Sequence, residues 1–128
     1  MRSSVVAFTL ALALPTHVSA EGQPSKPMTE KYSQKNLLKN WALSACLAIS
    51  SKDAGAKADA NATASAYMEF GRQRIEAYEE LRKLAEKYAT LRYSGSIPSE
   101  FNTMKCIDLF HSGELDRLVT KLTKPDRR

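Results

Sequence analysis

The stretch NLLKNWALSAC, residues 36–46, decides the fold of this chain. Its apolar side chains recur at the three- and four-residue spacing that places them on one face of an α-helix: Leu37, Leu38, Trp41 and Ala45. The pattern predicts an amphipathic helix over about residues 30–51. Cys46 follows directly beside the apolar face, where it can tie this helix to a later one.

The rest of the chain is also typical of helices. Ala, Leu, Lys and Glu are plentiful, and no run of alternating β-branched residues predicts a strand. Further apolar stripes at helical spacing cover about residues 62–71, 75–91, 102–110 and 112–124. With 128 residues there is room for one core. We therefore expect an all-α fold, a small single-domain bundle of four to five helices with one disulfide, over residues 30–124.

Several helix boundaries depend on local signals. The small and charged segment 53–61 is compatible with a weakly formed turn of helix or with a mobile connection. Gly71 favours a break between the second and third helices, and Asn102 and Ser112 are expected to be N-caps. The apolar stripe of the third helix is Ile75, Tyr78, Leu81, Leu84 (or Ala85) and Tyr88. That of the fourth helix is Met104, Cys106, Ile107, Leu109 and Phe110.

Residues 1–20 have the layout of a secretory signal peptide. Arg2 precedes an apolar run from Val5 to Leu14, and small residues lead up to Ala20. The run is too short to cross a membrane, which takes about 20 apolar residues. We expect export, cleavage after Ala20, a loose leader over residues 21–29 and no membrane association afterwards.

The charge of the chain excludes one class of partner. Without residues 1–20, which contain Arg2 and no acid, the formal charge falls from +5 to +4. The basic residues are spread along the chain and mixed with acids, whereas nucleic-acid binding requires a clustered basic surface. We therefore expect no nucleic-acid partner.

Cys46 and Cys106 are the only cysteines in the sequence. An even pair in a small exported domain predicts a disulfide, and closing a loop of this length stabilises a fold by about 4 kcal/mol. Two cysteines and His111, the one histidine outside residues 1–20, are too few ligands for a zinc site. A nucleophilic pair of Cys106 and His111 is disfavoured because five residues on a helix turn the two side chains apart.

The chain lacks the motifs of common catalytic chemistry. It contains no HExxH, no GxSxG and no glycine-rich phosphate loop, and no pair of carboxylates stands on an apolar face. We therefore predict a binding protein, such as an inhibitor or a chaperone, and no catalytic residue, cofactor or metal.

The longest irregular connection is RYSGSIPSEFN, residues 92–102. Glycine and proline punctuate it, and Ser96-Ile97 before Pro98 should be extended. Loops on rigid scaffolds often carry binding, so the candidate partner-binding residues are Tyr93, Ser94, Gly95, Ser96, Ile97, Pro98 and Ser99. A plain loop with Tyr93 and Ile97 packed into the core remains the alternative.

Three segments together resemble a known family. NWALSACLA at residues 40–48, SAYMEFG at 65–71 and NTMKCIDLFHS at 102–112 are similar to the motifs of immunity proteins that neutralise type VI secretion amidase effectors. The order of the motifs and the positions of both cysteines match, over about residues 32–122. The chain looks most similar to the branch paired with the fourth class of amidase effectors.

The resemblance implies a periplasmic, all-helical, disulfide-bonded homodimer. Such proteins bind a papain-like cysteine amidase that cuts the peptide stems of peptidoglycan, and they occlude its active-site cleft. The element that enters the cleft corresponds to residues 93–99 here. A disulfide-bonded periplasmic chaperone of the acid-stress type remains the alternative; it would bind many unfolded chains rather than one amidase.

Overall fold

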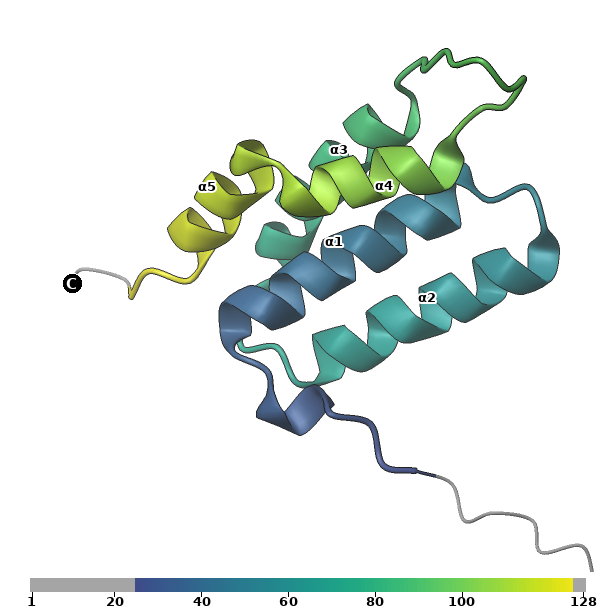
Figure 1. Cartoon of the computed structure of the whole chain (residues 1–128). Helices are drawn as coiled ribbons and strands as arrows, with labels where there is room; N and C mark the ends of the chain where they lie inside the picture. The colour runs from purple at the N-terminus through teal and green to yellow at the C-terminus, as the bar shows by residue number, and fades with distance from the viewer. Residues whose placement is uncertain (1–24, 126–128) are drawn as a thin grey trace, which may run out of the picture.

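The computed structural model describes residues 25–125 and shows helices and connections there, with no strand (Figure 1). The predicted signal peptide and its cleavage site at Ala20 lie outside these residues. A short 3-10 turn, Thr29–Lys31, precedes five α-helices, α1 to α5, which span Gln34–Ser50, Ala54–Glu69, Ile75–Ala89, Asn102–His111 and Gly113–Leu122. The prediction of an all-α bundle is confirmed. None of the helices in this part of the chain is both long and apolar enough to cross a membrane.

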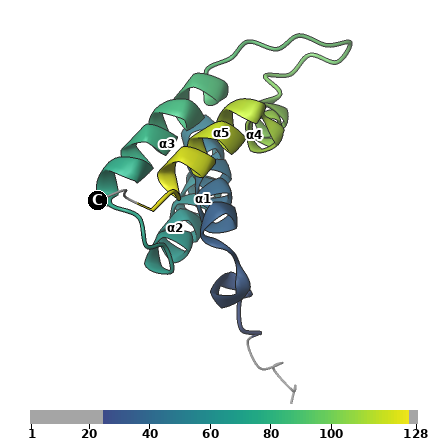
Figure 2. The ribbon, with the colours of Figure 1, turned by 90° about the vertical axis from the view of Figure 1, so that its left-hand side faces the viewer.

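Helix α1 lies at the centre of the bundle and packs against the other four α-helices (Figure 2). The predicted stripe is its buried face, which comprises Leu37, Leu38, Trp41, Ala42, Ala45 and Cys46. The helix begins later than predicted, because the Ser33 hydroxyl accepts a hydrogen bond from the Asn36 backbone N–H and caps it there.

Helix α2 corrects our interpretation of segment 53–61. The carboxylate of Asp53 accepts a hydrogen bond from the Ala56 N–H at 2.7 Å, so a regular helix begins at Ala54 and runs to Glu69 without a break. Alanine has the highest helix propensity, which explains why so small and polar a segment is helical. Ala60 and Ala64 are the buried residues of α2, facing α1 with little side-chain bulk.

The predicted break at Gly71 is confirmed, although the reason for a glycine at this position differs from the prediction. Gly71 does not adopt a positive φ. The hydroxyl of Tyr78 lies against it instead, so that any Cβ at this position would overlap the hydroxyl oxygen. Tyr78 is 4% exposed, packs edge-on against Trp41 with ring centroids 5.2 Å apart, and its hydroxyl has no hydrogen-bond partner within residues 25–125. Burial raises the pKa of Tyr78.

The disulfide joins α1 to α4. Cys46 and Cys106 are bonded, their Cα atoms lie 5.6 Å apart, and both side chains are fully buried. The predicted pairing is confirmed. It holds the ten-residue helix α4 against the centre of the bundle, next to the connection that leads out of α3.

Three predicted core residues are exposed: Ile75, Met104 and Ile107. Ile75 is the first residue of α3, and Ala77, Tyr78 and Leu81 supply the inner face of that helix. In α4 the disulfide turns Cys106 and Leu109 inward, which leaves Met104 and Ile107 on the flanks of the buried face.

The two predicted N-caps differ in outcome. Ser112 caps α5 as expected, since its hydroxyl accepts a hydrogen bond from the Leu115 N–H at 3.1 Å. Asn102 is the first residue of α4, and Phe101 occupies the N-cap position in a left-handed conformation, φ 53° and ψ 37°. The side chain of Asn102 bonds to other groups, described below.

Candidate functional site

The connection between α3 and α4 stands out from the bundle in both views of the ribbon (Figures 1 and 2). It contains the predicted binding residues Tyr93 to Ser99 and no helix or strand. Ile97 is 71% exposed, so the alternative in which it packs into the core is wrong. The chain bends at Ser96 and Ile97, where an extended segment was predicted. The chain has to reverse within this connection to reach α4, and the bend at its tip provides the reversal.

The outgoing limb of the loop is fastened to α4 by Tyr93. Its hydroxyl donates a hydrogen bond to the Asp108 carboxylate at 2.7 Å, and its side chain is half-buried. This hydrogen bond is the main cause of a raised pKa for Tyr93, and desolvation of the hydroxyl is the second cause. Tyr93 therefore supports the base of the loop, and Ile97 is the large apolar side chain at its tip.

The two limbs touch each other at Gly95. The ring of Phe101 packs so closely that a Cβ added to Gly95 would lie 2.8 Å from the ring Cζ. A larger residue at this position would force the Phe101 ring or the limb to move. Beside this contact is an open hollow of about 350 Å³, whose lining includes Tyr93, Phe101 and Met104.

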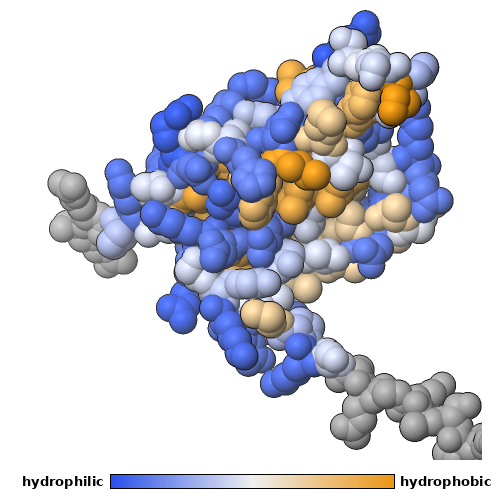
Figure 3. Space-filling model, in the orientation of Figure 1, coloured by the Kyte–Doolittle hydropathy of each residue, from blue (hydrophilic) through white to orange (hydrophobic). Residues whose placement is uncertain are grey.

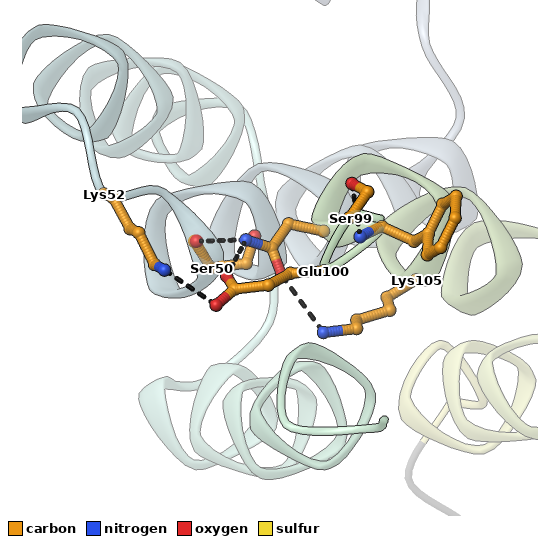
Figure 4. A network of polar contacts seen from close by, with 7 residues as sticks. Ser50, Lys52, Ser99, Glu100 and Lys105 are labelled. Carbon is orange, nitrogen blue, oxygen red and sulfur yellow. Dashed lines mark hydrogen bonds and ion pairs between the residues drawn. The ribbon is translucent and has the colours of Figure 1, made fainter. Parts of the chain in front are cut away.

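The returning limb is held by a polar network (Figure 4). Asn102 donates from its side-chain nitrogen to the Ser50 carbonyl oxygen and to the Glu100 carboxylate, each at 3.1 Å. Glu100 also pairs with Lys52 at 2.7 Å, and this hydrogen bond is the main cause of a lowered pKa for Glu100. Lys105, buried in α4, donates to the Asn102 oxygen at 3.1 Å.

An apolar surface continues from the loop onto α4. In Figure 3 apolar side chains gather over α4 and beside the loop, and the exposed large hydrophobic residues of this region are Ile97, Met104 and Ile107. The loop was predicted from its sequence, whereas the contribution of α4 to this surface was not. The signal was present in the composition of this helix, which has more apolar residues than one face of ten positions can bury.

The arrangement suits binding. A bent, exposed loop is anchored at both ends to helices that a disulfide holds together. Among residues 25–125, no three His, Cys, Asp or Glu side chains converge on a possible metal position.

The comparisons with known proteins agree with this geometry. A family model described as Tai4, type VI secretion system (T6SS) amidase immunity protein, matches residues 36–119. Among curated proteins, none matches the chain significantly.

Several solved structures are similar to the chain. A chain of the Tae4/Tai4 effector–immunity system from Salmonella typhimurium is 52% identical, with a TM-score of 0.75, over 79% of this chain and 100% of that one. A structure from a study of type VI-secreted toxins and self-resistance proteins in Serratia marcescens is 32% identical, with a TM-score of 0.74, over 85% of this chain and 94% of that one.

A third structure contains the Salmonella typhimurium effector Tae4 in complex with the immunity protein Tai4 from Enterobacter cloacae. It is 22% identical, with a TM-score of 0.66, over 75% of this chain and 99% of the matched chain, and therefore shows a shared fold. The family match confirms the prediction of an immunity protein rather than an enzyme. The chain belongs to the Tai4 family of type VI secretion system amidase immunity proteins.

Proposed function

We propose that this chain binds a Tae4-type amidase and inhibits it by placing the loop Tyr93 to Ser99 in the active-site cleft. The observation that carries the proposal is that the tip of the loop is exposed while both of its ends are hydrogen-bonded to helices. Ile97 is 71% exposed, whereas Tyr93 and Asn102 fasten the two limbs to α4 and α1. A loop held in this way loses little conformational freedom when it binds.

The mechanism is steric occlusion. A cleft that accepts flexible peptide stems of peptidoglycan can also accept a narrow segment of small residues, which here is Ser94-Gly95-Ser96. Ile97 supplies apolar area at the tip for a partner pocket. The immunity protein needs no reactive group of its own.

The partner is inferred from the related systems. The chain is 52% identical to a chain of the Salmonella typhimurium Tae4/Tai4 system, and the Salmonella Tae4 also forms a complex with the Tai4 of Enterobacter cloacae. An effector that accepts immunity proteins from two species is a suitable probe for this chain. We expect Salmonella Tae4 to be bound and inhibited.

We further propose that the protein acts in the periplasm, as a homodimer, after cleavage behind Ala20. The layout of residues 1–20 and the buried disulfide support export to an oxidising compartment. The helical domain comprises residues 30–124, preceded by the leader 21–29. N-terminal sequencing of the exported protein tests the cleavage site. Light scattering at micromolar concentration tests the dimer, and a monomer mass would refute it.

The experiment for the loop replaces Ser94 to Ile97 by two glycines and measures cleavage of peptidoglycan by Salmonella Tae4. We expect the helical circular dichroism to persist and inhibition to be lost. A finer pair of variants is Ile97→Ser and Ile75→Ser, which remove the same side chain from two exposed positions. Only Ile97→Ser should weaken inhibition. If the loop-replaced protein inhibits as well as its parent, a helix face carries the inhibition and the proposal is wrong.

A further inference from the structure

Asn102 has a role that its position in the helix does not explain. We propose that Asn102 is a positioning residue, which fixes the returning limb of the loop in the conformation that the amidase cleft accepts. The inference rests on the proposed function, because it takes the loop as the inhibitory element. According to this inference, contacts between α1 and α4 preorganise the loop in the free protein.

The side chain of Asn102 joins three parts of the molecule through Ser50, Glu100 and Lys105, which are labelled in Figure 4. One N–H of its amide reaches the Ser50 carbonyl oxygen at the end of α1, and the other reaches Glu100 on the limb. Its oxygen accepts from the ammonium of Lys105, a residue 6% exposed that has no carboxylate within ion-pair distance in residues 25–125. Both donors and the acceptor are thus in use.

The effect of Asn102 extends into the limb through Glu100 and Phe101. The second oxygen of Glu100 pairs with Lys52, so this residue is held from both sides. Phe101, between Glu100 and Asn102, adopts a left-handed conformation that side chains disfavour, and its N–H donates to the Ser99 hydroxyl. In this conformation its ring lies against Gly95 and closes the two limbs onto each other.

Core packing cannot hold the loop in the same way. Every residue from Ser94 to Glu100 is exposed, so these residues bury little apolar surface and their conformation depends on the contacts at the base. A loop without its base contacts would have to be ordered on binding, and the affinity would fall accordingly.

The substitution Asn102→Asp separates positioning from folding. An aspartate keeps an acceptor for Lys105 and suits the first turn of a helix, but it loses both N–H donors and places a negative charge beside Glu100. We expect helical circular dichroism close to that of the parent and affinity for Salmonella Tae4 about tenfold weaker. The nuclear Overhauser contact between Gly95 Hα and the Phe101 ring should be lost in the free protein.

The matched control is Asn36→Asp. Asn36 is exposed and is the third residue of α1, so this variant has the same change in charge and also lies in the first turn of a helix. It should bind Salmonella Tae4 as the parent does. The double variant Asn102→Asp with Glu100→Gln restores a hydrogen bond with donor and acceptor exchanged, and it should recover part of the affinity and of the Overhauser contact.

The outcomes distinguish this inference from the proposed function. If Asn102→Asp binds as tightly as the parent, or keeps the Gly95–Phe101 contact, Asn102 does not position the loop. If Asn102→Asp does not fold, Glu100→Leu is used instead, because it removes the bonds from the exposed Glu100 to Asn102 and Lys52. The same loss of affinity and of the Gly95–Phe101 contact is then expected, and its absence would overturn the inference. If the loop-replaced protein binds as well as its parent, the proposed function fails, whatever the Asn102 variants do.

Discussion

Replacing Gly71 by alanine probes the turn between α2 and α3. The new Cβ would overlap the Tyr78 hydroxyl and lie 3.2 Å from both the Tyr78 Cζ and the Met68 carbonyl oxygen. The Tyr78 ring cannot easily withdraw, because it is 4% exposed and packs edge-on against Trp41. Either the ring or the turn has to move.

The expected cost follows from overpacking. Inserting a methyl group into a packed site costs about 1–3 kcal/mol, and alanine recovers about 0.4–1 kcal/mol by restricting the unfolded chain. We expect a net destabilisation of about 1–2 kcal/mol for Gly71→Ala. Tyr78→Phe alone removes a buried hydroxyl that lacks a partner, so it should be neutral or stabilising by about 1 kcal/mol.

The assay is urea denaturation of both single variants and the double variant, followed by far-ultraviolet circular dichroism. Without the hydroxyl, the cost of Gly71→Ala should fall by about 1 kcal/mol, a coupling expected of residues in contact. Gly113→Ala is the control, because the nearest atom to its Cβ, at 3.2 Å, is the flexible end of Arg117. Equal costs of Gly71→Ala in both backgrounds, or marked destabilisation by Tyr78→Phe, would refute the reasoning.

Three further predictions concern other contacts of the fold. Thiol titration of the denatured, unreduced protein should find none free, and replacing both Cys46 and Cys106 by serine should lower the free energy of unfolding by about 4 kcal/mol. The hydrogen bond from Lys39 holds the pKa of Asp116 below its ordinary value of 3.8, so this pair stabilises the fold above that pH and less as pH falls through the lowered pKa. Asp116→Asn should therefore reduce the melting temperature at neutral pH, and the difference from the parent should vanish in strong acid; a constant difference would contradict this. Tyr93→Phe, which removes the bond from the loop to α4, should weaken binding of Salmonella Tae4 severalfold and leave the melting temperature unchanged; unchanged affinity would argue against this anchor.

The sequence predicted what depends on local pattern. The stripe through Leu38 and Trp41 has one possible buried face, so the central helix could be identified without a structure. Ser112 directly precedes a segment with apolar residues at helical spacing and acids in its first turn. This is a local signal for an N-cap. The irregular loop was recognisable from its glycine and proline for the same reason.

What the sequence did not reveal depends on contacts between distant residues. The role of Asn102 is determined by Ser50, which comes from another helix, and by a left-handed Phe101, which no propensity indicates. The support of Tyr93 by Asp108 depends on how α4 is oriented, and the disulfide sets that orientation. The exposure of Met104 has the same origin, since its stripe alone is equally compatible with either flank facing inward.

The position of the disulfide along the chain has a consequence for damage to the loop. Cys46 precedes the loop and Cys106 follows it, so the loop is part of a closed covalent ring. One proteolytic cut between residues 93 and 99 opens this ring without separating the two pieces. The nicked protein would migrate as one band without reductant and as two bands with it. Tyr93 would still hold one cut end to α4 and Asn102 the other, so a protein nicked in this loop keeps both pieces attached.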